Sequence, residues 1–365
     1  MKRICVLIPA YNEQIVISST IESLIESGFN PHSIFIVDDC STDQTAEVAR
    51  KYTENVVTMP TNSGKANAQS YALKHFKLLR KYDYVVMMDC DSVVGDHFKE
   101  IIYAYIYKHP EIDLFVGQVK NAKSSNLISA LRTIEYTFSH NIVKKGQNNF
   151  GVMYVAPGCA SVYSTRILKK LIFDPNTLAE DMDLTLQVHA LNGRIKYLHE
   201  AEVVTQDPQS LSDYSKQITR WFRGFWQVVD KYNILKYGLR SRVTLYMLYI
   251  ILDTLFANRI LTAFVSAFFL PLSIVMLGIG VDFFVFTMIT LYAAIKTQRY
   301  SILWKTPALY LLLFFNAYVF IKSFFEVIIL RRKSFKWNKV ARYKEHEDEE
   351  IISSATSSTT NTSSS

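Results

Sequence analysis

The first half of the chain alternates between short apolar runs and longer runs with a helical period. The apolar runs have the length of buried strands and cover residues 3–11, 33–41 and 82–92. Residues 17–28 follow the first apolar run and residues 42–52 follow the second. Both segments carry apolar side chains three and four positions apart, as one face of an α-helix requires. This order of strand and helix predicts an α/β domain with a mostly parallel sheet covered by helices.

The pattern changes near residue 243, after which Leu, Ile, Phe, Tyr, Val and Ala dominate. Only eight residues between Val243 and Leu330 are charged, which is the composition of membrane helices and not of a soluble core. Four apolar segments cover residues 243–258, 260–280, 281–295 and 307–330. The first is short and either spans a bilayer or lies at its surface. A break at Gly278–Gly280 is expected to reverse the chain between the second and the third.

Much of the net charge of +7 lies beside these apolar segments. The flanking basic residues are Lys231, Lys236, Arg240, Arg242, Arg331, Arg332, Lys333, Lys336 and Lys339. Such flanks favour the cytoplasmic side and anionic lipid, so a multi-pass membrane protein with a cytoplasmic first domain is expected. If the first domain and the basic residues after the last apolar segment both lie on the cytoplasmic side, the chain must cross the membrane an even number of times. Four membrane-spanning segments satisfy this requirement and three do not. Nucleic-acid binding is disfavoured because the charges do not form one soluble face.

The composition predicts three regions. Residues 1–236 are expected to form a cytosolic nucleotide-binding domain, and residues 237–336 interfacial and transmembrane helices. Residues 337–365 contain an acidic run followed by a Ser/Thr-rich end, which cannot bury a core and is predicted to be disordered.

Acidic residues follow each of the three predicted strands. These residues are Glu13, Asp38, Asp39, Asp89 and Asp91. Ligands of parallel sheets lie beyond the carboxyl ends of the strands, and carboxylates gathered there repel one another unless a cation fills the space. Asp89 and Asp91 suit Mg²⁺ or Mn²⁺, which takes one or two carboxylates and leaves its other positions to phosphate and water. No G-x-G-x-x-G run follows these strands, which argues against a nicotinamide enzyme.

The run QITRW at residues 217–221 precedes the first apolar segment. Gln217, Arg220 and Trp221 share one face of a helix. Arg suits a phosphate, and Trp suits the apolar face of a sugar ring. An alternative is an amphipathic helix with a Trp anchored at a membrane surface.

Four motifs stand in order: IVDDCSTD (36–43), DCD (89–91), LAEDMD (178–183) and QITRW (217–221). This order resembles the family 2 inverting glycosyltransferases of the GT-A fold. The membrane-bound members with a QxxRW motif are most similar: the hyaluronan, chitin, cellulose and poly-N-acetylglucosamine synthases and the ceramide glucosyltransferases. Many of these synthases also carry membrane helices before the catalytic domain. This sequence shows none there, which leaves a complete polymer-secreting channel in one subunit in doubt.

The resemblance implies a role for each matching residue. Pro9, Tyr11, Glu13, Asp38, Asp39, Lys65 and Asp89 would border the nucleotide-sugar, and Asp89 and Asp91 would bind the metal. Glu180 and Asp181 would form the catalytic pair, with Asp181 as the general base. Gln217, Arg220, Trp221 and Gly158 would hold the diphosphate and the acceptor. The first turn of a helix would also explain the acidic run at 180–183, and both explanations can hold together.

The expected activity is transfer of a sugar from a UDP-sugar, glucose or N-acetylglucosamine, to a growing β-linked glycan or a lipid acceptor. Mn²⁺ or Mg²⁺ is the expected cofactor, and membrane lipid is an expected partner. A membrane transporter or channel with a nucleotide-sensing cytosolic domain is the alternative. It accounts for the apolar segments and the acidic loops but not for Asp181 together with QITRW.

Overall fold

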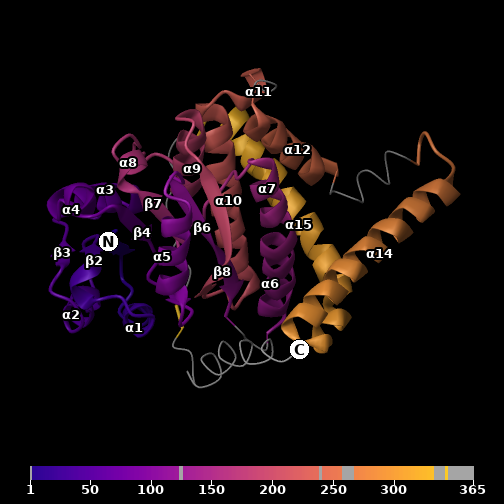
Figure 1. The fold of residues 1–365 in the computed structure, drawn as a ribbon. Coiled ribbons are helices and arrows are strands. Elements are labelled where there is room, and N and C mark those ends of the chain that lie inside the picture. Colours follow the sequence, from indigo (N-terminus) through magenta and orange to yellow (C-terminus); the bar gives the residue numbers. More distant parts are fainter. Residues whose placement is uncertain (1, 123–125, 238–240, 257–266, 333–341, 344–365) are drawn as a thin grey trace.

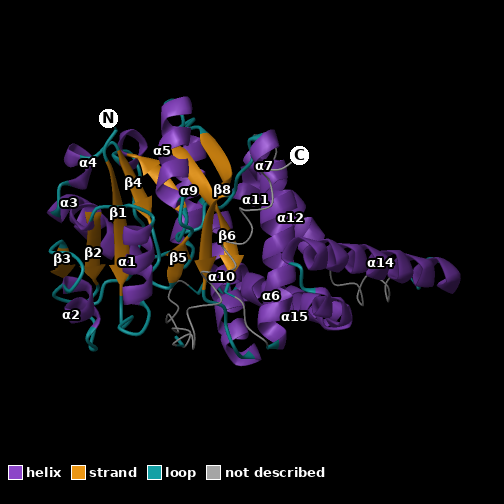
Figure 2. Cartoon of the chain, turned by 60° about the horizontal axis from the view of Figure 1, so that its bottom comes forward, coloured by secondary structure: helices purple, strands orange, loops and turns teal. Residues whose placement is uncertain are grey.

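The computed structural model describes residues 2–122, 126–237, 241–256, 267–332 and 342–343 (Figure 1). Residues 2–122 and 126–231 form an α/β unit around one sheet, and Arg342 and Tyr343 contact this unit. The apolar helices that follow pack against one side of this unit, and the longest of them extends away from it in both views (Figures 1 and 2).

The central sheet has eight described strands in the order β3-β2-β1-β4-β7-β6-β8-β5. They are β1 (Ile4–Ala10), β2 (Ile34–Asp38), β3 (Val56–Thr58), β4 (Tyr84–Met87), β5 (Ser92–Val94), β6 (Leu114–Asn121), β7 (Ser161–Ser164) and β8 (Ile195–Thr205). The pairings β1–β2, β1–β4, β2–β3 and β6–β8 are parallel, and β4–β7, β5–β8 and β6–β7 are antiparallel. The predicted mostly parallel sheet is confirmed.

Helices cover both faces of the sheet because the strands are apolar on both sides. Along β1, Val6 and Ile8 belong to the core beneath α1 (Ile17–Glu26), α2 (Thr45–Arg50) and α5 (Phe98–Lys108). Cys5 and Leu7 belong to the opposite core, beneath α3 (Lys65–His75), α4 (Leu78–Lys81), α8 (Thr165–Leu168) and α9 (Glu180–Ala190). The alternation along β1 follows from the two-residue period of a strand. Gly28 follows Ser27, the C-cap residue of α1, and has a positive φ of 94°.

A second layer joins the sheet to the apolar helices. It contains α6 (Leu127–Phe138), the π-helical turn η2 (Ser139–Val143), α7 (Lys144–Phe150) and α10 (Leu211–Lys231). The short 3₁₀ turn η1 (Pro31–Ser33) does not belong to this layer and precedes β2. Ile128 and Ile134 of α6, and Tyr214 and Ile218 of α10, share one apolar core with the helices beyond residue 290. The α/β unit is therefore packed directly against the apolar half of the chain.

The apolar half contains α11 (Ile234–Tyr237), α12 (Arg242–Phe256), α14 (Leu272–Thr297), η3 (Tyr300–Lys305), α15 (Thr306–Phe324) and η4 (Phe325–Ile329). Two of the described helical segments, Leu272–Thr297 and Tyr300–Ile329, are long and apolar enough to cross a membrane. The expected reversal at Gly278–Gly280 is wrong, because α14 runs through both glycines without a break. Added Cβ atoms at these glycines would meet nothing within 4 Å, so no close packing requires a bend there.

Some sequence predictions fall outside the described residues. Residues 257–266, which include the first third of the apolar segment 260–280, are among them, as is most of the tail 337–365. Within that tail, Arg342 and Tyr343 contact the α/β unit: Gln206 Nε2 donates to the Tyr343 carbonyl oxygen at 2.9 Å.

Candidate active site

The loops that follow β1, β2 and β4 meet at one edge of the sheet, as their parallel direction predicted. Asn12 Oδ1, after β1, accepts from the Thr42 N–H at 2.7 Å, after β2. Cys90 Sγ, after β4, donates to the Pro9 carbonyl oxygen at 3.2 Å. The predicted nucleotide-site residues therefore stand at the ends of these strands or in the loops that follow them: Pro9, Tyr11, Glu13, Asp38, Asp39, Asp89 and Asp91.

Asp39 shapes the loop that leads into α3. Its carboxylate oxygens accept from the backbone N–H groups of Ser63 and Gly64, each at 2.8 Å. Gly64 has a φ of +84°, which a residue with a side chain rarely adopts. Burial raises the pKa of Asp39, although these two hydrogen bonds lower it. The turn places Lys65 at the first position of α3.

Lys65 joins two of the predicted motifs. Its Nζ lies 2.6 Å from Asp89 Oδ1 and 2.8 Å from Glu180 Oε1. Burial lowers the pKa of Lys65, but the two carboxylates raise it further, so the net pKa lies well above its usual value. Burial likewise raises the pKa of Asp89, yet Lys65 leaves the net pKa below the usual range. The ammonium is therefore a fixed positive charge between the loop after β4 and the start of α9.

Gly158 allows the loop before β7 to approach this ion pair. A Cβ atom there would lie 2.6 Å from Lys65 Nζ and 3.5 Å from Asp89 Oδ2. The distance to Nζ is shorter than the distances that real Cβ atoms keep from other heavy atoms. The predicted site residue Gly158 thus borders the charged centre, and any side chain would displace Lys65.

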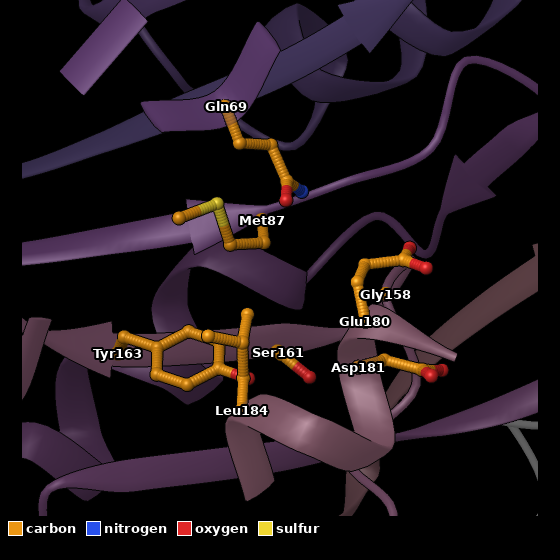
Figure 3. A pocket seen from close by; sticks show the side chains of 8 residues that line it. All are labelled: Gln69, Met87, Gly158, Ser161, Tyr163, Glu180, Asp181 and Leu184. Atoms are coloured by element: carbon orange, nitrogen blue, oxygen red, sulfur yellow. The ribbon is translucent and has the colours of Figure 1, made fainter. Parts of the chain in front are cut away.

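A pocket opens beside Glu180 and Asp181 in the first turn of α9 (Figure 3). Its remaining lining residues are Gln69, Met87, Gly158, Ser161, Tyr163 and Leu184. The carboxylates of Glu180 and Asp181 extend toward the same side of the pocket (Figure 3). Gln69 Oε1 is buried and has no hydrogen-bond partner among the described residues. The sequence patterns did not indicate that Gln69 lines a site. This residue is the last of the run NSGKANAQ (62–69), which also contains Lys65.

The pKa of the Asp181 side chain is raised above that of an ordinary carboxylic acid. Burial and then the neighbouring charge of Glu180 raise its pKa to about 6, while Lys65, the Met182 N–H and Arg220 act in the opposite direction. Thr185 Oγ1 donates to the Asp181 carbonyl oxygen at 2.6 Å and accepts from the Ala156 N–H at 2.9 Å. These bonds tie the first turn of α9 to the loop that carries Gly158. The group can exchange a proton near neutral pH, as a general base must.

The QITRW run lies on α10, which packs closely over the start of α9. A Cβ atom on Gly224 would lie 2.6 Å from Ala179 Cβ and 2.8 Å from Ala179 N. Gln227 Oε1 accepts from the Leu178 N–H at 2.9 Å. The charge of Arg220 lowers the pKa of both Asp89 and Asp181. Arg220 is therefore near both acidic motifs.

Gln217 and Trp221 have different surroundings. Gln217 Oε1 is buried without a hydrogen-bond partner among the described residues. The Trp221 ring is partly buried against α6, where the Arg132 guanidinium lies 5.0 Å from its centroid. Trp221 thus contacts a residue that no sequence motif singled out.

Arg342 enters the site from the C-terminal part of the chain. Its Nη1 lies 2.6 Å from Asp91 Oδ2, and its Nε donates to Glu13 Oε2 at 2.9 Å. Sequence reasoning missed this residue because one Arg in a charged tail carries no pattern. Both Asp residues of the DCD run therefore have a cationic partner in the structure, Lys65 for Asp89 and Arg342 for Asp91.

The chain is similar to known proteins in sequence and in fold. The family model described as "Glycosyltransferase like family 2" matches residues 2–224. The poly-β-1,6-N-acetyl-D-glucosamine synthase of Staphylococcus epidermidis is 26% identical over 249 residues, which cover 66% of this chain and 59% of the synthase. The synthase of the same name from Staphylococcus aureus strain COL is 26% identical over 255 residues, or 68% of this chain and 60% of that protein. The chain thus matches about 60% of the length of these curated relatives.

A solved mannosyltransferase from Pyrobaculum calidifontis, in complex with GDP-Man and Mn²⁺, has a similar fold. The TM-score is 0.57 and the sequence identity 16%, with 85% of this chain and 87% of the mannosyltransferase covered. This likeness confirms the GT-A-like α/β fold. Because the family model spans more than half of the chain, the chain belongs to glycosyltransferase family 2.

Proposed function

We propose that the chain transfers a sugar from a UDP-sugar to a β-linked glycan or lipid acceptor, with inversion at the anomeric carbon. The observation that carries the proposal is the position of Lys65 Nζ, 2.6 Å from Asp89 and 2.8 Å from Glu180. This contact joins the DCD run, the ED pair and the basic loop of α3 in one site. N-acetylglucosamine is the favoured donor sugar because the relatives are named poly-β-1,6-N-acetyl-D-glucosamine synthases, and glucose is the second choice.

The charges of the site fit the departure of a diphosphate. Lys65 and Arg220 lie near Asp89, and Arg342 contacts Asp91. When UDP leaves, its negative charge grows, and fixed cations stabilise that charge in the transition state. Gln69 Oε1 and Gln217 Oε1, both buried without a described partner, are available to accept hydrogen bonds from substrate hydroxyl groups.

Asp181 is proposed as the general base. In its ionised form it accepts the proton of the acceptor hydroxyl, whose oxygen attacks the anomeric carbon while the bond to UDP breaks on the opposite face. The new glycosidic bond then has the inverted configuration. The elevated pKa of about 6 makes Asp181 a stronger base than an ordinary carboxylate and still leaves it mostly ionised at neutral pH.

Asp89 and Asp91 fit a divalent ion by the chemistry of their donor set. Mn²⁺ and Mg²⁺ bind through one or two carboxylates and complete their coordination with substrate phosphate and water. The ion would supply positive charge to the leaving diphosphate. In the described structure these carboxylates pair with Lys65 and Arg342 instead, so direct binding of the ion requires these contacts to rearrange.

A membrane location and the three-region organisation belong to the same proposal. Residues 1–236 would form the cytosolic catalytic domain and residues 237–336 the interfacial and transmembrane part. Two described helical segments have the length and apolar character of membrane spans. The number of crossings and the orientation stay predictions, supported by the basic residues that flank the apolar segments.

Purified full-length protein in detergent tests the proposal directly. UDP release and product formation are measured with radiolabelled UDP-N-acetylglucosamine and UDP-glucose, with Mn²⁺ or with a chelator. The proposal predicts metal-dependent transfer that Asp181→Asn reduces by about 10³-fold or more while UDP binding persists. Absence of metal-dependent UDP release from either donor contradicts it. Sizing the product separates a glycan ladder from a single glycosylated lipid.

A further inference from the structure

Arg132 of α6 is a buried arginine that contacts the QITRW helix. Its side chain is 5% exposed, and its guanidinium carbon lies 5.0 Å from the Trp221 ring centroid and 5.8 Å from the Tyr214 ring centroid, both on α10. Residues 214 and 221 are seven positions apart and share one helical face. Arg132 therefore lies against the α10 face that presents Trp221.

The guanidinium is held by hydrogen bonds from each of its three nitrogen atoms. Nε donates to Asp207 Oδ1 at 3.3 Å, Nη1 to Glu135 Oε2 at 2.8 Å, and Nη2 to the Tyr136 hydroxyl at 2.9 Å. A planar group bonded at three nitrogens has little freedom to rotate. Its face is consequently fixed relative to the Trp221 indole.

Stability alone is a weak reason for this arrangement. Charged groups lose hydration when they are buried, and a hydrophobic replacement of an ion pair often leaves stability unchanged or higher. The pair is also imperfect, because Asp207 Oδ2 is buried without a hydrogen-bond partner among the described residues. What the cation provides here is a defined contact for an aromatic ring that is itself only partly buried.

We propose that Arg132 is a positioning residue that holds the Trp221 indole in the orientation needed for the sugar acceptor. This inference rests on the proposed function and on the acceptor-holding role that the family resemblance implies for Trp221. An indole that can rotate binds a sugar ring less well, because ordering it costs conformational entropy when the acceptor binds. Donor binding, which involves Lys65, Asp89 and Arg220, does not depend on this contact.

The test compares kinetics toward the two substrates. Arg132→Met removes the charge and the contact of the guanidinium with the Trp221 ring, and Arg132→Lys keeps a charge but loses the planar fork. We expect Arg132→Met to raise the KM for a short β-1,6-linked N-acetylglucosamine oligosaccharide by about tenfold, with the KM for UDP-N-acetylglucosamine changed by less than about twofold. Arg132→Lys is expected to give an intermediate acceptor KM, and it preserves the test should the methionine variant not fold.

Arg223→Met is the matched control on α10, the helix that carries Trp221. Arg223 pairs with Glu326 of η4 at 2.7 Å, so its loss removes an ion pair that α10 itself makes and leaves the contact between Arg132 and Trp221 in place. This variant should keep the acceptor KM of the unmodified chain. An equal increase in acceptor KM in both Arg variants overturns the inference, because it shows a general loosening of α10.

A double-mutant cycle with Trp221→Phe decides whether Arg132 acts through the indole. Trp221→Phe alone should raise the acceptor KM, and adding Arg132→Met should raise it little further. Full additivity overturns the inference, as does an unchanged acceptor KM in Arg132→Met while the unmodified chain transfers sugar. If the unmodified chain forms no product with any donor, the proposed function fails, and the positioning role fails with it.

Discussion

Arg342 Nη1 lies 2.6 Å from Asp91 Oδ2, which joins the C-terminal part of the chain to the loop after β4. The same guanidinium donates to Glu13 at 2.9 Å, a carboxylate in the loop after β1. Asp91 and Glu13 are both largely shielded from solvent, and carboxylates in such surroundings need a cation nearby. The C-terminal segment supplies this cation across 329 positions of sequence.

Arg342→Ala should strengthen the binding of Mn²⁺ to the nucleotide-free protein. The guanidinium and the metal ion compete for Asp91, so loss of the first favours the second. We expect the apparent affinity to rise about tenfold, or about 1.4 kcal/mol, when free Mn²⁺ is followed by electron paramagnetic resonance. Arg331→Ala, which removes a surface pair with Asp230 at 3.0 Å, should leave the affinity unchanged. Weaker Mn²⁺ binding in Arg342→Ala contradicts competition at Asp91.

The rate of transfer should fall as the pH drops through about 6. Asp181 accepts a proton only in its ionised form, and burial, its largest influence, raises its pKa to about 6. The value of kcat should therefore be low below this pH and approach a plateau above it. Rates measured from about pH 5 to about pH 8 report the midpoint. Asp174→Asn, which removes the carboxylate that pairs with Lys231, should keep the same midpoint, whereas the residual rate of Asp181→Asn should lack this acid limb.

Asp181→Asn should also make the protein more stable at neutral pH. Because the folded pKa of about 6 lies above the ordinary value of 3.8, the folded state binds the proton more tightly than the unfolded state does. Stability is then lost as the pH rises from about 4 to about 6, and the amide removes this loss. The melting temperature of the variant should exceed that of the unmodified chain at pH near 7.5, and the difference should shrink near pH 4. A lower melting temperature of the variant at both pH values is the opposing result.

Gly158→Ala should reduce transfer without unfolding the chain. The new Cβ atom would lie 2.6 Å from Lys65 Nζ, so the flexible lysine must leave its place between Asp89 and Glu180. We expect kcat/KM to fall by about 10- to 100-fold, equivalent to about 1.4–2.7 kcal/mol of transition-state stabilisation. Gly146→Ala lies on α7 with nothing within 4 Å of the added Cβ atom. It should leave kcat/KM unchanged and raise helix stability by about 0.5–1 kcal/mol. Equal kinetics in the two alanine variants would show that Gly158 does not border the working site.

The gathering of the acidic loops was predictable because strand direction decides it. Once residues 3–11, 33–41 and 82–92 are parallel neighbours, the segments after them must lie at one edge of the sheet, and Glu13, Asp39 and Asp89 follow β1, β2 and β4 there. The motif order also indicated the family, which the match over residues 2–224 confirmed. The expected break at Gly278–Gly280 failed because glycine only permits a turn, and neighbouring contacts decide whether one forms.

Local spacing placed Arg220 and Trp221 on one helix but could not say what each of them meets. The sequence by itself determined the α/β domain, its acidic edge, the helix of residues 217–221 and the apolar character of the C-terminal half, since these depend on period, polarity and strand direction. Only the tertiary structure decided that Lys65 bridges Asp89 and Glu180, that the Arg132 guanidinium lies over the Trp221 ring and that Arg342 reaches Asp91. Each of these contacts joins residues far apart in the chain, and a single charged side chain leaves no periodic pattern that would reveal its distant partner.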